Sequence, residues 1–274
     1  MTAFYNEIDP YAAQWLRNLI AAGHIAPGIV DERSIEDIKP VELAGYTQCH
    51  FFAGIGVWSR ALRLAGWPDD KPVWTGSCPC QPFSAAGKGV GFDDERHLWP
   101  AFHWLISQCR PPVVFGEQVA SKDGLQWLDL VQTDLEGSGY ASAAADLCAA
   151  GVGAPHIRQR LYWVADAECR AAERHGLSLG ATESGSESEI WTRPQRVRDD
   201  AGDGVNADRP RPTNGHWRDA DWLYCRDDKW RPVEPCTFPL AHGITNRVGR
   251  LRAYGNAIVS QVAQAFIETY LNHD

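Results

Sequence analysis

The chain has 274 residues, a net charge of −9 and a hydrophobic content of 44%, values that fit a globular protein of one or two domains and exclude global disorder. It holds no apolar run near the roughly 18 residues of a membrane span, and its N-terminus lacks the pattern of a signal peptide. The eight cysteines include no Cys-x-x-Cys pair, which argues against a disulfide scaffold and favours reduced thiols. We therefore expect a cytoplasmic protein without a membrane segment.

The distribution of charge is uneven along the chain. An acidic net charge argues against a protein that covers nucleic acid with its whole surface. Between residues 166 and 252, however, all basic residues but one are Arg. This Arg-rich region is either a local surface for phosphates and bases or an ordinary solvated surface of mixed charge.

Short apolar strands alternate with helices along the first 165 residues. The expected strands are Ala3–Asn6, Cys49–Ala53, Val73–Gly76, Val113–Phe115 and Leu161–Ala165. The expected helices lie between Pro10 and Gly23 and at Val57–Ala65, His97–Cys109 and Trp127–Glu136, and a last amphipathic helix covers Ala257–Leu271. This alternation predicts an α/β protein whose mostly parallel sheet is covered on both faces.

A turn with two glycines follows the expected strand at residue 49. The segment FAGIG, residues 52–56, lies between this strand and the next helix. Glycines let the backbone approach a ligand closely, and a helix N-terminus offers unpaired N–H groups. A tight turn without a ligand is the alternative.

The segment GSCPCQPFS, residues 76–84, is more specific. Pro79 and Pro82 restrict the backbone on both sides of Cys80, which suits a thiol held in one attacking position. A thiolate is a good nucleophile even as a minor species at neutral pH. The alternatives are a buried structural cysteine and a metal site with Cys78, although Cys-x-Cys lacks a second pair of ligands.

Charged and polar side chains stand beside three further elements. Glu117 follows an apolar strand, where a carboxylate either caps the next segment or serves a site at the carboxyl edge of the sheet. Arg158 and Arg160 precede a strand on one face, either in a site or as protection of a sheet edge. Asn256, before the last helix, either caps that helix or reaches a ligand.

Taken in chain order, FAGIG, PCQPFS, Glu-x-Val, RQR and GNA resemble the motif series of the DNA cytosine-5 methyltransferases. The resemblance covers residues 46–165 and 239–270, and PCQPFS followed by AGKGVGFDDER is highly specific. It implies a Rossmann-like, S-adenosylmethionine-dependent methyltransferase fold with a small target-recognition insert. The function that it implies is DNA methylation, as in restriction–modification, in a bacterium or a phage-infected host cell.

The resemblance also implies roles for residues. Cys80 would add to C6 of a cytosine flipped out of double-stranded DNA, Glu117 would bind N3 and the exocyclic amino group, and Arg160, with Arg158 nearby, would bind O2. Implied contacts to S-adenosylmethionine are Phe52, Ala53, Gly54, Ile55, Gly56, Pro79, Asn256, Ala257 and Ile258. Implied contacts to the substrate are Gln81, Ser84, Arg247 and Arg250. We expect a monomer that uses no metal.

The spacing departs from the family at one place. Only 22 residues separate Gly56 from Pro79, which leaves no room for the two strands that the family places there. We expect a local permutation in which these strands precede the FAGIG turn, with Glu7 and Ile8 at the cofactor ribose and Asp31 at the adenine. Right-handed crossovers would then place the helix Val57–Ala65 on the opposite face of the sheet, unless the linker Gly66–Pro72 loops around the strand end. The alternative for Glu7 is a capping acid.

The sequence thus divides into four regions. Residues 1–48 complete the cofactor site, residues 49–165 form the catalytic core, residues 166–250 recognise the target, and residues 251–274 return to the core. Two smaller differences from the family are Gln118 in place of the common Asn and Ala86 in place of a Ser. An RNA cytosine-5 methyltransferase, an inactive DNA-binding regulator and transfer of a group other than methyl remain as alternatives.

Overall fold

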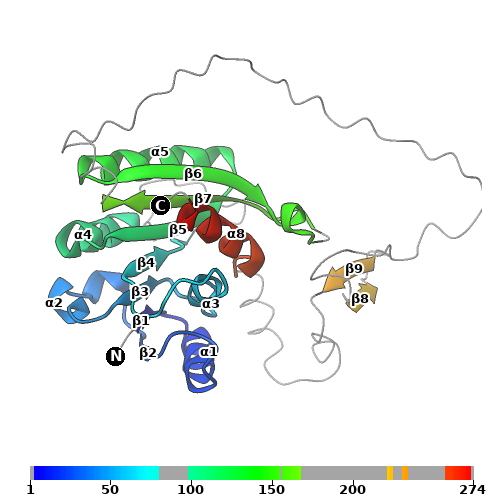
Figure 1. Ribbon diagram of the computed structural model, residues 1–274, viewed down its shortest axis with the longest axis horizontal. Coiled ribbons are helices and arrows are strands. Elements are labelled where there is room, and N and C mark those ends of the chain that lie inside the picture. The colour runs from blue at the N-terminus through cyan, green and yellow to red at the C-terminus, as the bar shows by residue number, and fades with distance from the viewer. Residues whose placement is uncertain are drawn as a thin grey trace, which may run out of the picture.

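The computed structural model describes residues 3–79, 98–154, 156–167, 221–224, 230–233 and 257–272. Its centre is a seven-stranded sheet with helices on both faces (Figure 1). The strands, in chain order, are β1 (Ala3–Asn6), β2 (Gly28–Asp31), β3 (Gln48–Phe51), β4 (Val73–Gly76), β5 (Val113–Val119), β6 (Ala141–Cys148) and β7 (Gln159–Asp166). The helices are α1 (Pro10–Ala21), α2 (Pro40–Leu43), α3 (Val57–Leu64), α4 (Trp99–Cys109), α5 (Lys122–Gly137) and α8 (Ser260–Leu271), with short 3₁₀ turns at Ile35–Asp37 and Ala149–Val152.

The sheet is mostly parallel, as the sequence predicts. Its strand order is β2-β1-β3-β4-β5-β7-β6, and β7 alone within it runs antiparallel to both of its neighbours. A separate antiparallel pair joins β8 (Asp221–Tyr224) to β9 (Trp230–Val233), within the region where the sequence indicates a small unit. The strand β6, which the sequence pattern did not predict, lies at the edge of the sheet.

The first two strands confirm the permutation expected from the spacing. β1 pairs with β2 on one side and with β3 on the other, and all three strands are parallel. In the sequence, β1 and β2 therefore precede β3, the strand that leads into the FAGIG turn. In the sheet, β1 lies directly beside β3, and β2 lies beside β1.

Helix α3 lies on the same face of the sheet as α1, which differs from the expectation for right-handed crossovers. The Tyr5 hydroxyl bonds to Ser59 of α3 at 3.0 Å, and Tyr5 packs in one cluster with Leu16 of α1. The chain crosses from β1 through α1 to β2 and from β3 through α3 to β4, and these two crossovers run in opposite directions across the sheet. Because both helices lie on the same face, the two crossovers have opposite hands. One of the two is therefore left-handed, against the strong general preference.

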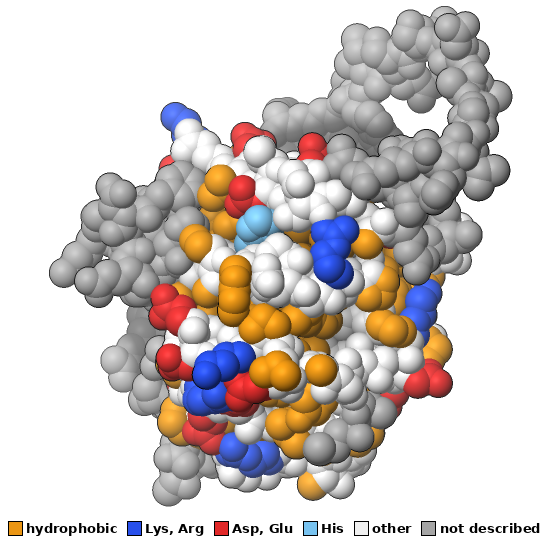
Figure 2. Space-filling model, turned by 90° about the vertical axis from the view of Figure 1, so that its left-hand side faces the viewer, with side chains coloured by type: hydrophobic (Ala, Val, Ile, Leu, Met, Phe, Trp, Pro, Cys, Tyr) orange, Lys and Arg blue, Asp and Glu red, His pale blue; other side chains and the backbone are white. Residues whose placement is uncertain are grey.

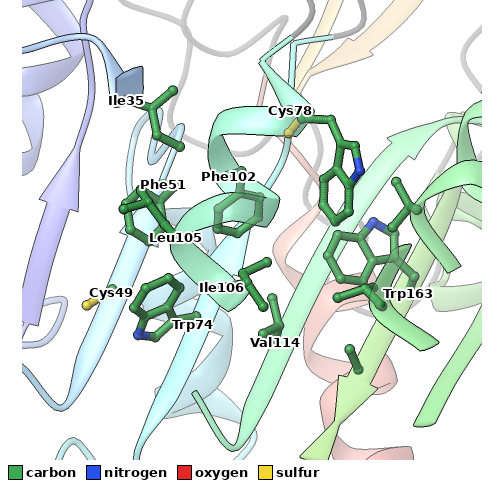
Figure 3. Packing of buried hydrophobic residues seen from close by; sticks show 14 of the residues in the cluster. Ile35, Cys49, Phe51, Trp74, Cys78, Phe102, Leu105, Ile106, Val114 and Trp163 are labelled. Atoms are coloured by element: carbon green, nitrogen blue, oxygen red, sulfur yellow. The ribbon is translucent and has the colours of Figure 1, made fainter. Parts of the chain in front are cut away.

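Two main hydrophobic clusters fill the space between the sheet and its helices. One lies under α4 and α5 and contains Phe51, Trp74, Phe102 and Trp163 (Figure 3). The other lies under α3 and α8, and the alternation of β5 assigns Val114 to the first cluster and Phe115 to the second. Both faces of the central strands are therefore buried, as in other parallel sheets.

The surface over α2, α4 and α5 mixes charged and hydrophobic side chains (Figure 2). Val41 on α2, Trp104 on α4 and Leu125 on α5 are exposed hydrophobic residues of these helices. Among the described residues, no helix combines the length and the apolar character that crossing a membrane requires.

Candidate active site

The carboxyl ends of four strands, β1 to β4, lie in one row across the sheet, and this row continues to Gly116 within β5. Asn6 pairs with both Asp31 and Phe51, Phe51 pairs with Gly76, and Gly76 pairs with Gly116. The residues that come next on four of these strands are Glu7, Phe52, Ser77 and Glu117. The register therefore brings the glycine turn, the buried acid and the segment that leads to Cys80 to a single edge.

Several residues of the predicted site fall outside the described part of the chain. They are Cys80, Gln81, Ser84, Arg247, Arg250 and Asn256. The described groups are those that surround the segment leading to the expected nucleophile.

The FAGIG turn uses left-handed backbone at three positions. Phe52 has φ 51°, Gly54 has φ 55° and Gly56 has φ 78°. Gly56 is the N-cap of α3, and a Cβ there would come within 3.1 Å of Leu16. The positive φ therefore favours glycine at residue 56, and an added Cβ would also crowd the Leu16 side chain.

Glu7 reaches this turn from β1. Its Oε2 accepts a hydrogen bond from the Gly54 amide at 2.7 Å, and its Oε1 accepts one from the Asp9 amide at 2.9 Å. The cap of α1 is made by Asp9, whose Oδ1 accepts from the Tyr11 amide. Glu7 is thus not the capping acid of α1, and its carboxylate belongs to the turn.

Asp31, at the end of β2, is bound by a neighbouring cation. Arg33 approaches its Oδ2 at 2.7 Å and also bonds to Glu42 at 2.9 Å. The hydrogen bond from the Arg33 side chain holds the pKa of the Asp31 carboxyl below its usual value. Asp31 is therefore ionised, and Arg33 fixes its orientation. Ile8 follows the neighbouring strand β1, and its side chain is 66% exposed.

Glu117 is the buried acid of the site. The residue is 8% exposed, and Arg160 Nε lies 2.9 Å from its Oε1. Burial raises the pKa of the Glu117 carboxyl, although Arg160, Arg158 and a hydrogen bond from Ser77 all oppose this rise. The two guanidinium groups thus act on one carboxyl, and the carboxyl retains a proton more readily than an exposed one.

Arg158 connects this acid to the C-terminal segment. Its guanidinium donates a hydrogen bond to the carbonyl of Ala257, 99 residues later in the chain. Burial lowers the pKa of Arg158, and Ile258 packs in the cluster under α3 and α8. Ala257 and Ile258 therefore lie next to Arg158 and the sheet.

Two residues of the site are not predicted by the sequence pattern. The indole N–H of Trp58 donates to Ser77 Oγ at 2.9 Å, and the Ser77 side chain lowers the pKa of the neighbouring Glu117 carboxyl. Serine in a loop and tryptophan in an amphipathic helix carry no pattern that links them. Only the register of β4 and β5 makes Ser77 a neighbour of Glu117.

Cys78 has a structural role. Its side chain lies in the cluster that contains Trp99 and Trp163 (Figure 3), and burial raises the pKa of its thiol well above the usual range. A buried, protonated thiol is a poor nucleophile and a poor metal ligand. Within the described residues, no group of three or more His, Cys, Asp or Glu side chains could hold a metal ion.

The comparison with known families identifies the chain. A family model described as C-5 cytosine-specific DNA methylase matches residues 51–215, which are 165 of the 274 residues. The chain belongs to this family. The match includes the FAGIG turn, the segment around Cys80, and Glu117, Arg158 and Arg160, and it shows the methyltransferase fold that the motifs predict.

Individual relatives within the family are only moderately similar. The chain is 33% identical to the Type II methyltransferase M.HhaI of Haemophilus parahaemolyticus over 167 residues, which are 47% of this chain and 51% of that protein. It is 33% identical to the Type II methyltransferase M.AplI of Arthrospira platensis over 104 residues, which are 37% and 29% of the two proteins. The chain thus spans about half or less of the length of these curated relatives.

Among solved structures, a variant of Spodoptera frugiperda DNMT2 aligns with 60% of this chain and 41% of its own. The TM-score is 0.40 and the sequence identity is 18%.

Proposed function

We propose that this protein transfers a methyl group from S-adenosylmethionine to C5 of a flipped-out cytosine in double-stranded DNA. The observation that carries the proposal is the buried Glu117 carboxyl, which contacts Arg160 and lies beside Ser77, a residue only three positions before Cys80. Membership of the cytosine-5 methylase family supports the choice of base and atom.

Each group has a definite task in this reaction. The Cys80 thiolate adds to C6 of the ring, and the electron pair of the C5–C6 double bond becomes available at C5. Glu117, whose raised pKa favours its acid form, shares its proton with N3 and so stabilises the adduct. Arg160 binds O2, C5 accepts the methyl group and the donor leaves as S-adenosylhomocysteine. Transfer of the C5 proton to water then expels the Cys80 thiolate, restores the double bond and lets the N3 proton return to Glu117.

The residues at the carboxyl edge fit the methyl donor. S-adenosylmethionine supplies an electrophilic methyl group on a sulfonium centre. The Glu7 carboxylate suits a ribose diol, since a carboxylate offers about four acceptor positions and only some are used by Gly54 and Asp9. Ile8, exposed beside Glu7, offers an apolar contact at the ribose, and the ionised Asp31 ends the neighbouring strand β2, where we place the adenine.

The DNA must present the base outside its stack. C5 and C6 of cytosine are enclosed in duplex DNA, so the target nucleotide has to flip into the site. We assign recognition of the target to residues 166–250, whose Arg residues suit guanine edges and phosphates. Gln81, Ser84, Arg247 and Arg250 complete the proposed substrate contacts.

The test is covalent trapping. Duplex DNA of random sequence that contains 5-fluorocytosine is incubated with the protein and S-adenosylmethionine, and adducts are resolved on a denaturing gel. A trapped complex is expected, because fluorine at C5 cannot leave as a proton does. It should require S-adenosylmethionine, and it should be lost in Cys80→Ala.

Two controls make the result specific. Cys78→Ala removes a thiol two residues away and should leave trapping intact, because Cys78 lies in the core. A parallel reaction with 5-fluorocytosine in transfer RNA examines the RNA alternative. No adduct with DNA in any sequence context would contradict the proposal, and an adduct with RNA alone would change the substrate.

A further inference from the structure

A tryptophan on α3 is fixed against the two strands that carry the site. Trp58 is 5% exposed, and its ring stacks on Phe115 with centroids 6.1 Å apart and packs edge-on against Tyr162 at 6.0 Å. Phe115 lies two residues before Glu117 on β5, and Tyr162 is the cross-strand partner of Glu117 on β7. The indole is therefore held in a fixed position relative to the Glu117 carboxyl.

The hydrogen bonds of Ser77 have a fixed direction. An indole N–H can only donate, so the 2.9 Å contact from Trp58 Nε1 occupies a lone pair of Ser77 Oγ. The single proton of the Ser77 hydroxyl is then directed to a different acceptor. We take that acceptor to be the Glu117 carboxyl, because the pairing of Gly76 with Gly116 places Ser77 beside Glu117 and the Ser77 side chain lowers the pKa of that carboxyl.

The same carboxyl receives a second donor from another direction. Arg160 Nε lies 2.9 Å from Glu117 Oε1, and Arg158 and Tyr162 are the other titratable groups that face Glu117. A carboxyl proton cannot point at a group that is itself donating. The acid form of Glu117 must therefore carry its proton at a position that neither Ser77 nor Arg160 occupies.

We propose that Ser77, oriented by the Trp58 indole, is a positioning residue that fixes the rotation of the Glu117 carboxyl and directs its proton to the substrate side. This inference rests on the proposed function, since the base is the group that would receive the proton. It assigns to the residue after β4 a task separate from that of the nucleophile Cys80. Without the relay the carboxyl could rotate, and its proton could face the protein.

Three variants separate the relay from ordinary packing. Ser77→Ala removes the donor and leaves the shape of the loop nearly unchanged. Ser77→Thr keeps the hydroxyl, and Trp58→Phe keeps a ring between Phe115 and Tyr162 but removes the N–H. A purely structural role would change thermal stability without changing the protonation of Glu117.

The first measurement needs neither DNA nor the methyl donor. The protein is labelled with ¹³C at the Glu side-chain carboxyl, the Glu117 signal is assigned with Glu117→Gln, and its titration is followed by NMR. Ser77→Ala is expected to raise the midpoint by roughly one unit, because a hydrogen bond to an ionised group is lost. Trp58→Phe should move it in the same direction by less, and Ser77→Thr should restore the wild-type midpoint.

The second measurement connects the relay to methyl transfer. In Ser77→Ala the limb of the kcat–pH profile assigned to Glu117 should shift by the same amount, with the KM for S-adenosylmethionine unchanged, and Ser77→Thr should restore the profile. An unchanged Glu117 titration in Ser77→Ala would overturn the relay. Suppose that the Glu117 titration shifts in Ser77→Ala but the wild-type protein never methylates DNA. This outcome would support the relay and count against the proposed function.

Discussion

The carboxylate of Glu7 accepts a hydrogen bond at 2.7 Å from the backbone amide of Gly54, 47 residues further along the chain. This contact joins the end of β1 to the turn that follows β3. It places an acid from the permuted segment at the FAGIG turn, although the family model matches the chain only from residue 51 onward. The contact thus supports the view that residues 1–48 complete the cofactor site.

Replacement of this acid should weaken binding of S-adenosylmethionine. Glu7→Ala removes the proposed acceptor for the ribose hydroxyls, which corresponds to a loss of about 1–3 kcal/mol, or roughly 5- to 150-fold in affinity. Isothermal titration calorimetry measures this loss directly. Glu32→Ala, which breaks a surface ion pair with Arg17, is the matched control and should bind as the wild type does. Equal affinities in both variants would return Glu7 to a structural role.

Loss of the buried acid should impair the chemical step. In Glu117→Gln the side chain keeps its size but has no carboxyl proton, so we expect kcat to fall by about 10²- to 10⁴-fold. Binding of S-adenosylmethionine should remain, since Glu7 and the glycine turn are unchanged. Single-turnover transfer of a labelled methyl group to DNA measures the effect. A variant that retains more than a tenth of the wild-type rate would contradict the proposed role.

The stability of the fold should fall in mild acid because of His50. Its ring is buried, stacks on Tyr5 at 4.8 Å and bonds to Thr75 Oγ1 at 2.8 Å. Burial lowers the pKa of His50 from 6.5 to about 3. The unfolded chain therefore takes up a proton below pH 6.5 that the folded chain excludes, and between pH 7 and pH 5 the free energy of unfolding should fall by about 2 kcal/mol from this group.

A variant isolates this contribution. Chemical denaturation of the wild type and of His50→Gln at pH 7, 6 and 5 compares the two slopes. Glu117, whose pKa is raised in the folded state, acts in the opposite direction because folding then favours the bound proton, but it is common to both proteins. If both proteins lose stability equally, then His50 is not the group that responds.

Two glycines should respond in opposite ways to a single added methyl group. A Cβ at Gly116 would lie 2.1 Å from ring atoms of Trp163, so Gly116→Ala should destabilise the protein by about 1–3 kcal/mol or more. At Gly137, the last residue of α5, an added Cβ would meet no atom within 4 Å, so Gly137→Ala should stabilise the protein by about 0.5–1 kcal/mol. Thermal unfolding of the two variants checks the difference in sign.

Much of this fold could be predicted because local patterns and tertiary packing agree. β1 and β4 have the bounds that their apolar runs predict, since both are central strands buried on both faces. β6 was missed because its Ala-rich segment lacks β-branched residues and is mostly half-exposed at the sheet edge. Helix α5 begins at Lys122, five residues before the predicted start, because Ser121 caps it through the Gly124 amide.

Some residues of the candidate site could likewise be predicted from the sequence, and others could not. The glycine turn, Glu117 and the Arg pair could be found from motifs, because each motif lies next to a strand end in the sequence. The relay from Trp58 through Ser77 could not, since its three members come from α3, from the loop after β4 and from β5. Such a contact exists only after strand register and helix packing are set.

The opposite hands of the two crossovers have a consequence for protein engineering. Consider a gene in which residues 1–47 are moved into the linker that joins α3 to β4, with all linker residues kept. The chain would then connect the strands β3, β1 and β2 in one direction across the sheet. All of these connections would then share one hand, with the same side chains in the same places. The rearranged polypeptide should fold into the same sheet, and its synthesis would show whether the order of the segments matters to the finished molecule.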